Sequence, residues 1–515
     1  MKITKYIKKF ASKLFSKLVI MGLIILFQIG WVIMLVYHAS ERNSIFNMCL
    51  NIVAVAFALY VVNRDMKPYN KLTWIFLILC FPMVGCPCYW LFGRPALVRW
   101  TRKRMRIVEE RIKPYREEDK ELSKKFKEED IDGYKQSHYI TNCAGYPLYK
   151  EGDTPYFNCG EDMFDVMLND LRNAKKYIFL EYFIVKQGYM FDTILSILVE
   201  KVRQGVEVRF IYDDVGCIGT VPPSFYKMMR EKGIQCERFN PFRPFLSVIM
   251  NNRDHRKIMV IDGKIAYTGG INLSDEYINK HERFGYWKDS AIRVTGNGVW
   301  SITTMFLEMW DYITNTVEDC LQYKVDSVES NVKSGLIQPY SDTPLDHETV
   351  GENIYLNMIQ QAKEYVYIFT PYLIIGPEMV TALVNAAKSG VDVRIVTPGI
   401  PDKKMVFMLT QSHYETLIRG GVKIYEYSRG FLHAKCFVCD DKYAVVGTVN
   451  LDFRSLYLHF DNGVVLYLSD AVMDVKRDMK ETFENSREIS IDFCESRNIV
   501  VRLISGILHL FAPLL

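Results

Sequence analysis

Three apolar runs dominate the first ninety residues of the chain. The first, Leu18–Tyr37, has no charged residue and is as long as the ~20 residues that a membrane-spanning helix needs. The second and third are Ile45–Val62 and Leu72–Phe92, and the third is interrupted by Pro82, Gly85 and Pro87. Because no small-residue cleavage site follows the first run, we expect a membrane anchor and not a removed signal peptide. A buried hairpin of a soluble protein is the alternative for the second and third runs.

Basic residues flank the apolar runs on both sides. Six lysines lie between residues 2 and 17, six arginines and lysines lie between residues 94 and 106, and the loop after the first run carries only Arg42. The positive-inside rule therefore places both flanks in the cytoplasm, with the second cluster against anionic lipid head groups. Three full crossings conflict with that placement. We predict two crossings, with the interrupted third run entering only the cytoplasmic leaflet, in a multi-pass protein of the cell membrane whose catalytic lobes lie on the cytoplasmic face.

From about Tyr139 onward, apolar strands alternate with helical runs, and the pattern occurs twice. Residues 174–184 resemble residues 362–372, residues 205–211 resemble residues 390–396, and residues 233–234 resemble residues 421–422. In each copy a glycine ends a helical run and a Val/Ile run follows, which predicts a strand. The repeated β-α-β order predicts an α/β fold with two homologous lobes, whose mainly parallel sheets are flanked by helices. We expect a binding site between the two lobes.

The same patterns divide the chain into six predicted parts. These are a membrane anchor (1–93), a basic and charged linker (94–137), a first lobe (138–319), a connector (320–335), a second lobe (336–490) and a C-terminal tail (491–515). Within the linker, residues 107–134 are rich in Glu and Lys and predict a solvated helix. The final run, Ile499–Leu515, is apolar but too short and too interrupted to span a membrane. We favour an interfacial helix there over a tail packed into a core.

One short motif occurs in each lobe with the same spacing. The first copy has His255, Lys257, Asp262, Gly269 and Asn272. The second has His433, Lys435, Asp440, Gly447 and Asn450, and the two histidines are 178 residues apart, as are the two asparagines. In a strand, alternate side chains share a face, so the histidine and lysine of each copy point the same way.

These residue types suit chemistry at a phosphate group. Histidine can act as nucleophile, base or acid near neutral pH, lysine is a compact charge for phosphoryl oxygens, and a carboxamide adds a donor. A single copy would be explained as well by a half-exposed strand with a solvated polar face. Matching spacing at five positions, twice, favours a shared site with two imidazoles, two lysines and two asparagines around one phosphorus atom.

Composition narrows the possibilities. Hydrophobic residues make up 49% and charged residues 24% of the 515 residues, which describes a folding chain and not a disordered one. Twelve cysteines are too few for a disulfide scaffold and indicate a reducing compartment. The net charge of +4 is modest, so its placement matters more than its size.

The paired motifs resemble the H-x-K-x4-D motifs of the phospholipase D superfamily, and within it the bacterial cardiolipin synthase branch. The resemblance extends from about Asn63 to the C-terminus. The stretches that carry it beyond the motifs include Trp74–Gly93, Asn252–His255, Gly269–Leu273, Trp287–Asp289, Thr370–Tyr372, Leu451–Ser455 and Ala512–Leu515. Two positions depart from the family pattern. The family's G-S appears here as Gly447-Thr448, and its N-F-E as His459-Phe460-Asp461.

The resemblance implies a ping-pong exchange of phosphodiesters through a phosphohistidine. It favours His255 as the nucleophile and His433 as the acid and base, although the near symmetry leaves that assignment open. Substrate oxygens would be held by Lys257, Lys435, Asn272 and Asn450, with Thr448 and Gly270 as further contacts. Asp289 and Asp461 would orient the histidines; ordinary surface acids are the alternative. The motif aspartates, Asp262 and Asp440, belong to the catalytic motifs, but we expect them to support the fold.

The leading hypothesis is synthesis of cardiolipin and glycerol from two molecules of phosphatidylglycerol, at an anionic membrane. Lipid hydrolysis or phosphatidyl transfer to another alcohol is the first alternative. A nuclease and a non-catalytic lipid-binding protein are the others; the apolar runs disfavour a nucleic-acid substrate, and the complete pair of motifs disfavours the loss of catalysis. We expect no metal and no cofactor, because no cluster has metal-ligand spacing and one phosphodiester replaces another.

Overall fold

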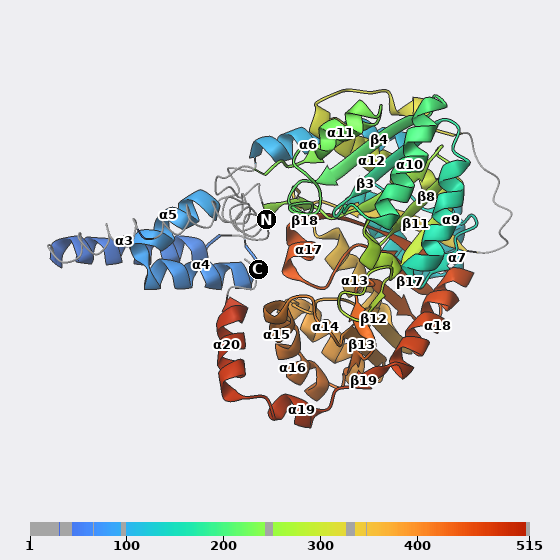
Figure 1. Cartoon of the computed structure of the whole chain (residues 1–515). Coiled ribbons are helices and arrows are strands. Elements are labelled where there is room, and N and C mark those ends of the chain that lie inside the picture. The colour runs from blue at the N-terminus through green and yellow to red at the C-terminus, as the bar shows by residue number, and fades with distance from the viewer. Residues whose placement is uncertain are drawn as a thin grey trace, which may run out of the picture. The chain divides into compact units, whose positions relative to one another are not determined.

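The computed structural model describes residue 30 and residues 44–64, 66–93, 99–242, 251–325, 335–346 and 348–510 (Figure 1). The chain divides near residue 97 into a small N-terminal unit and a large unit that holds both motifs. Apart from residue 30, the predicted run Leu18–Tyr37 lies outside the described residues, as do residues 511–515.

Three helices form the described part of the N-terminal unit: α3 (Ser44–Val62), α4 (Pro68–Cys80) and α5 (Pro82–Phe92). Trp74 and Tyr89 meet edge to face between α4 and α5, with ring centroids 5.4 Å apart. The third apolar run is thus divided into two helices, and Pro82 begins the second. Gly85 lets them approach closely, because a Cβ there would lie 2.3 Å from the carbonyl oxygen of Leu77.

Many large apolar side chains of α3 and α4 remain exposed, among them Ile45, Ile52 and Leu72. Within the described part of the chain, no helix combines the length and the apolar character that crossing a membrane requires. The predicted transmembrane helices therefore stay a prediction.

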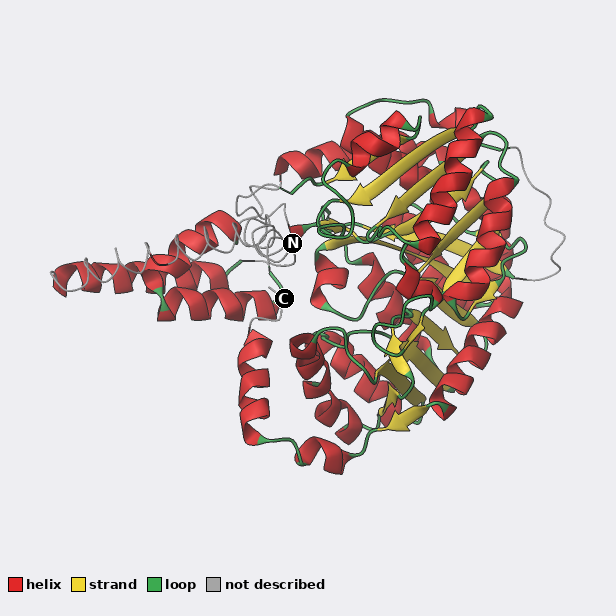
Figure 2. Cartoon of the chain, viewed as in Figure 1, coloured by secondary structure: helices red, strands yellow, loops and turns green. Residues whose placement is uncertain are grey.

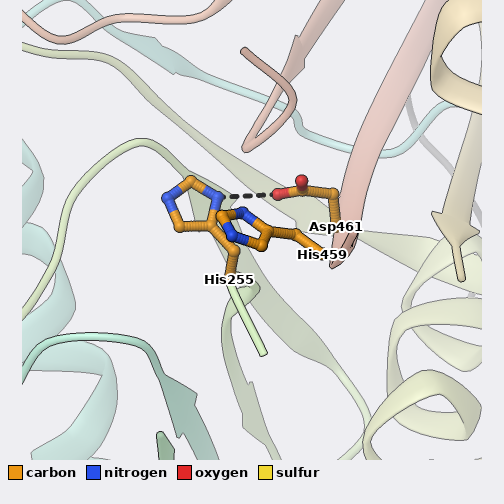
Figure 3. A group of neighbouring side chains, drawn as sticks. All are labelled: His255, His459 and Asp461. Carbon is orange, nitrogen blue, oxygen red and sulfur yellow. Dashed lines mark hydrogen bonds and ion pairs between the residues drawn. The ribbon is translucent and has the colours of Figure 1, made fainter. Parts of the chain in front are cut away.

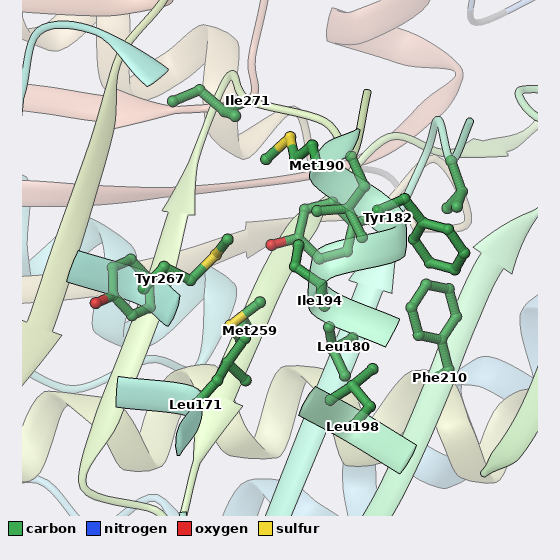
Figure 4. Close-up of a cluster of buried hydrophobic side chains, with 14 of the residues drawn as sticks. Leu171, Leu180, Tyr182, Met190, Ile194, Leu198, Phe210, Met259, Tyr267 and Ile271 are labelled. Atoms are coloured by element: carbon green, nitrogen blue, oxygen red, sulfur yellow. The ribbon is translucent and has the colours of Figure 1, made fainter. Parts of the chain in front are cut away.

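The first lobe is built on a seven-stranded sheet with the order β2-β10-β8-β7-β3-β4-β5. Its strands are β2 (Tyr156–Phe157), β3 (Tyr177–Tyr182), β4 (Glu207–Asp213), β5 (Gln235–Phe239), β7 (Lys257–Ile261), β8 (Ile265–Gly269) and β10 (Ala291–Thr295). Helices α9 (Gly160–Arg172), α10 (Tyr189–Arg203) and α11 (Phe225–Glu231) pack on one face, in a core that includes Leu180 and Ile194 (Figure 4). The neighbouring residue Phe179 points to the other face, where it stacks on Phe306 of α12 (Val299–Thr314) with centroids 4.6 Å apart.

The second lobe is built on a ten-stranded sheet with the main order β1-β11-β18-β17-β16-β12-β13-β14-β19, and β6 pairs with β18 beside that path. Its strands are β1 (Tyr149–Lys150), β6 (Arg253–Asp254), β11 (Leu336–Asp342), β12 (Tyr365–Phe369), β13 (Asp392–Pro398), β14 (Lys423–Tyr427), β16 (Cys436–Cys439), β17 (Tyr443–Gly447), β18 (His459–Tyr467) and β19 (Ser486–Glu488). Helices lie on both faces of the sheet (Figure 2). Tyr355 of α13 (Val350–Gln361) stacks on Phe437, whereas Phe483 of α18 (Asp470–Glu484) meets Tyr367 on the opposite face.

Both sheets are mixed, so the prediction of mainly parallel sheets was wrong. The strands of the repeated β-α-β runs are parallel, namely β3-β4-β5 and β12-β13-β14. The motif strands instead turn back in antiparallel hairpins, β7–β8 and β16–β17. The reason is local: Asp262 and Gly263, and likewise Asp440 and Asp441, have consecutive positive φ angles, which form a tight turn within a three-residue hairpin loop.

The charged segment 94–137 is not a solvated linker, which corrects that prediction. Its described part forms α6 (Arg99–Ile112), α7 (Lys120–Glu129) and α8 (Ile131–Tyr139), which pack on the two lobes. Buried Arg116 donates to Thr304 Oγ1 at 2.8 Å and pairs with Glu308, and Phe126 meets Tyr467 with ring centroids 5.2 Å apart. The high charge hid an amphipathic pattern, because the buried apolar positions of α6 and α7 recur every three or four residues.

Shorter elements complete the large unit. They are α14 (Pro377–Lys388), α15 (Lys404–Ser412), α16 (Tyr414–Arg419), α17 (Phe453–Tyr457), α19 (Ile491–Glu495), α20 (Ile499–Leu510), β9 (Tyr286–Lys288), β15 (Gly430–Leu432), η2 (Lys113–Tyr115), η3 (Ile140–Ala144), η5 (Asp275–Ile278), η6 (Gly296–Gly298) and η7 (Cys320–Tyr323).

The last helix, α20, exposes its apolar side and packs its polar side against the protein. On the side toward α15, His509 Nε2 lies 2.6 Å from Ser412 Oγ, and Ser505 is buried. The apolar side chains point outward: Leu503 is 64% and Ile507 62% exposed. A helix packed in the usual way would bury its apolar side and expose its polar side.

Candidate active site

Two short strand pairings cross between the lobes and bring the motifs together. Strand β6, just before His255, pairs with the start of β18 in the second lobe. Strand β15, just before His433, pairs with β9 in the first lobe. The backbone N–H of His255 donates to Phe460 O at 2.9 Å, and that of His433 donates to Lys288 O at 2.7 Å. The segment that carries each motif histidine is thus fixed by the opposite lobe.

Each histidine also takes its carboxylate from the opposite lobe. His255 Nδ1 lies 2.8 Å from Asp461 Oδ1, and His433 Nδ1 lies 2.7 Å from Asp289 Oδ2. Both carboxylates are fully buried. A carboxylate accepts from the protonated ring nitrogen, so Nδ1 carries the proton and Nε2 keeps the lone pair that a nucleophile or base needs.

Gly270 and Thr448 lie at matching positions of the two lobes, and both border these carboxylates. A Cβ on Gly270 would lie 1.9 Å from Asp289 Oδ1, so only glycine leaves room for that carboxylate. The hydroxyl of Thr448 donates a hydrogen bond to Asp461 Oδ1, and the residue is fully buried. The two residues therefore shape the carboxylate sites. Their direct contact with substrate stays a prediction.

The motif lysines are buried behind the histidines. Lys257 Nζ donates to the carbonyl oxygen of His255, and Lys435 Nζ donates to that of His433. Burial lowers the pKa of Lys435 to about 8 and also lowers that of Lys257. A bound anion would stabilise both ammonium groups, which is the property expected of a phosphate site.

The two motif asparagines are held differently. Asn272 accepts from Ile184 N at 3.0 Å and donates to Tyr277 Oη at 2.8 Å. The side-chain oxygen of Asn450 is buried without a hydrogen-bond partner among the described residues. Both asparagines line the pocket described next.

The motif aspartates lie outside this pocket and cap chain segments. Asp262 accepts three backbone N–H bonds of 2.7–2.9 Å from Lys175, Lys176 and Tyr177. Asp440 accepts the equivalent three from residues 363–365. Each sits in its hairpin turn and fixes the start of the neighbouring strand.

One pocket of about 500 Å³ contains both histidines and both motif asparagines. Its walls are aromatic near the histidines. Phe183 lies 5.1 Å from the His255 ring, and Tyr277, Trp287 and Phe431 lie within 5.8 Å of the His433 ring, between centroids. Further polar and basic side chains line the pocket: Arg253, Arg283, Asp402, Lys403, Arg454 and His459.

The imidazoles are neutral in this environment. Burial, together with the charge of Lys435, lowers the pKa of His433 to about 4. Burial and the two lysines lower the pKa of His255 well below its ordinary value. Burial opposes ionisation of Asp289, but His433 and Lys435 outweigh it and hold its pKa below its usual value. The pairs are thus neutral imidazoles beside buried carboxylates.

Known proteins share this architecture. The family described as "Cardiolipin synthase, PLD-like domain" matches residues 167–292 and 355–485, and a "Phospholipase_D-nuclease N-terminal" family matches residues 49–94. A cardiolipin synthase of Alkalihalophilus pseudofirmus is 33% identical over 471 residues, covering 90% of this chain and 92% of the relative. A cardiolipin synthase of Geobacillus thermodenitrificans is 32% identical over 492 residues, covering 93% of this chain and 95% of the relative.

The chain belongs to the cardiolipin synthase family. An uncharacterized protein of Streptococcus mutans is more similar still, at 44% identity over 465 residues, 90% of this chain and 100% of that protein. The fold agrees with a solved phosphatidylserine synthase of Haemophilus influenzae, with a TM-score of 0.56 and 14% identity over 74% of this chain and 98% of that one.

His459 is a pocket residue whose role the sequence did not indicate, although its departure from the cardiolipin synthase pattern was visible. Together with His255 and Asp461 it offers three possible metal-ligand atoms within 4.8 Å of one another (Figure 3). The positive charges of Lys257 and Lys435 beside this group disfavour a cation. An anion is the ligand that the pocket suits.

Proposed function

We propose that this chain transfers a phosphatidyl group between two molecules of phosphatidylglycerol and releases cardiolipin and glycerol. The observation that supports this most directly is the pair of crossed His–Asp contacts around one pocket. Nε2 of His255 would attack phosphorus while the bond to the glycerol oxygen breaks, and the leaving oxygen would take a proton from His433. The terminal hydroxyl of the second phosphatidylglycerol would then give its proton to His433 and attack phosphorus, breaking the P–N bond.

His433 must be protonated for the first step, although burial lowers its pKa to about 4. A bound phosphodiester supplies the missing negative charge and raises the pKa of the imidazole beside it. We therefore infer that substrate binding brings a proton to His433. Lys257, Lys435, Asn272 and Asn450 would hold the non-bridging oxygens as charge develops.

The acceptor carries a phosphodiester of its own, so a second cationic position is expected in the pocket. Lys403 lines the pocket, with Nζ 5.2 Å from the centroid of the Tyr372 ring, and its charge acts on His255. Among the described residues Lys403 has no ion-pair partner, whereas Arg283 is paired with Glu276 at 3.4 Å. We propose Lys403 as the main contact for the acceptor's phosphate.

We further propose that the chain is a multi-pass protein of the cell membrane with its catalytic lobes on the cytoplasmic face. The exposed apolar surface of α3 and α4 supports a lipid environment for the N-terminal unit. The outward apolar side of α20 supports an interfacial position for that helix. Phosphatidylglycerol and other anionic lipids would then be the surface on which the enzyme works.

Lipid analysis of a host that lacks cardiolipin but expresses this chain tests the proposed function. Cardiolipin should form in that host and should be absent with His255→Ala. Purified chain should convert phosphatidylglycerol alone to cardiolipin and glycerol, and should leave DNA intact. Phosphatidic acid as the main product would instead support a hydrolase, and a mixed phosphodiester formed with another alcohol would support a different acceptor.

A further inference from the structure

A third imidazole lies beside the catalytic ones. His459 begins β18, and its ring centroid is 5.2 Å from that of His255 (Figure 3). The residue lines the pocket and is only 9% exposed. The family pattern has asparagine at this position, so the imidazole is a feature of this chain.

The contacts of His459 define its tautomer. Arg454 Nε lies 3.4 Å from His459 Nε2, and a guanidinium can only donate, so Nε2 accepts. Burial lowers the pKa of His459 well below its ordinary value, so the ring is neutral and its single proton lies on Nδ1. Nδ1 has no hydrogen-bond partner among the described residues. A buried polar hydrogen without a partner destabilises the protein, which requires an explanation.

We propose that the Nδ1–H group of His459 donates a hydrogen bond to an oxygen of the phosphatidyl group while that group is attached to His255. The proposal rests on the proposed function, because it uses His255 as the nucleophile. His459 lines the pocket beside His255, so a phosphodiester bound there can supply the oxygen acceptor that Nδ1 lacks among the described residues. No covalent bond forms or breaks at His459.

The side of the pocket indicates which lipid is contacted. His459 adjoins His255, whereas the leaving glycerol and the incoming hydroxyl exchange their proton with His433. His459 therefore contacts the phosphatidyl group that is retained through both steps, not the alcohol that is exchanged. Loss of its donor should slow glycerol release and cardiolipin formation by the same factor.

Two substitutions distinguish the effect of the N–H donor of His459 from the effect of its ring. His459→Phe keeps a ring and removes the donor, and His459→Asn restores a side-chain N–H of the type found in the family. In single-turnover experiments with the full chain and phosphatidylglycerol, we expect His459→Phe to slow both steps about 10- to 100-fold. His459→Asn should recover most of that loss, to within about fivefold of the wild type, at an unchanged melting temperature.

A second measurement does not depend on cardiolipin synthesis. Inorganic phosphate binding, followed by calorimetry, should weaken about tenfold in His459→Phe and less in His459→Asn. Equal affinity in all three proteins, or slowing of the second step alone, would overturn the proposal. A wild type that binds phosphate but makes no cardiolipin would refute the proposed function instead, and the binding result would still test the donor.

Discussion

Each motif imidazole contacts one buried carboxylate, and the proposed dependence of activity on that contact can be measured with single substitutions. In Asp289→Asn the amide no longer stabilises an imidazolium at His433, so we expect activity to fall about 10²- to 10⁴-fold with little change in melting temperature. The matched control is Asp262→Asn, which removes a carboxylate that only caps backbone N–H groups. It should lower the melting temperature while the folded fraction retains its specific activity. The reverse pattern would assign Asp262 to the chemistry.

The buried histidines should make stability depend on pH. The pKa of His433 is about 4 in the folded chain and ~6.5 when unfolded, so between these values the unfolded state binds more protons. Stability should therefore decrease as pH falls from about 6.5 to 4, with a contribution from this residue on the order of 3 kcal/mol. The melting temperature of the wild type should fall relative to that of His433→Gln as pH decreases across that range. Parallel curves would contradict the assigned shift.

The proposed contact between Lys403 and the acceptor's phosphate can be tested with the adjacent Lys404 as a control. Lys403→Gln should lower cardiolipin formation about tenfold, because the acceptor's phosphate loses its counter-charge. Transfer to a neutral alcohol such as ethanol, whose product differs from phosphatidylglycerol, should change little. Lys404→Gln alters the next residue, which does not line the pocket, and both activities should persist. An equal loss for charged and neutral acceptors in Lys403→Gln would place the lysine elsewhere in the reaction.

For individual residues, the sequence indicated the two motifs, the orienting carboxylates and the supporting role of Asp262 and Asp440. It could not show which carboxylate serves which histidine. His255 and Asp461 are 206 positions apart, and their contact arises from the pairing of β6 with β18. It also could not show that Thr448 bonds Asp461, because a hydroxyl suits a phosphate equally well.

Among the elements, the β-α-β runs were predictable because each strand is buried and each helix ends at a glycine. The β-α-β pattern did not predict the hairpins β7–β8 and β16–β17, because the residue that turns each of them is also the aspartate of the motif. The aspartate of H-x-K-x4-D is itself a turn residue with a positive φ angle. The sequence predicted a helix in the charged segment but not its packing on the lobes, because the buried apolar positions of α6 and α7 are few and widely spaced.

Helix α20 provides a prediction at the element scale. Leu503→Glu or Ile507→Glu would put a charge on the outward apolar side, and we expect about tenfold lower activity toward phosphatidylglycerol in bilayers. Activity toward short-chain phosphatidylglycerol in detergent should be unaffected, because the pocket is unchanged. Val317→Glu is the control, since Val317 is 78% exposed and follows α12 in the first lobe, outside α20. Equal losses in bilayers and detergent would indicate a structural role for α20.

For the whole molecule, the crossing contacts require both lobes of one chain. His255→Ala and His433→Ala should each abolish exchange, and a mixture of the two variants should remain inactive. Each variant still holds one complete His–Asp pair, but the pocket of each lacks one of the two imidazoles. Activity that returns on mixing, measured as cardiolipin formed per minute, would show that lobes are shared between chains.

The crossed pairs also bear on how such a chain could arise. A single ancestral half would carry one histidine and one carboxylate meant for another copy, so it would be complete only as a symmetric pair. Once two halves are joined by gene fusion, neither can be lost, since each supplies the other's carboxylate. The other matching positions of the two lobes can then differ, as Gly270 and its counterpart Thr448 illustrate. Asymmetric positions of this kind are where the donor and acceptor sides of the reaction can be tuned separately by selection.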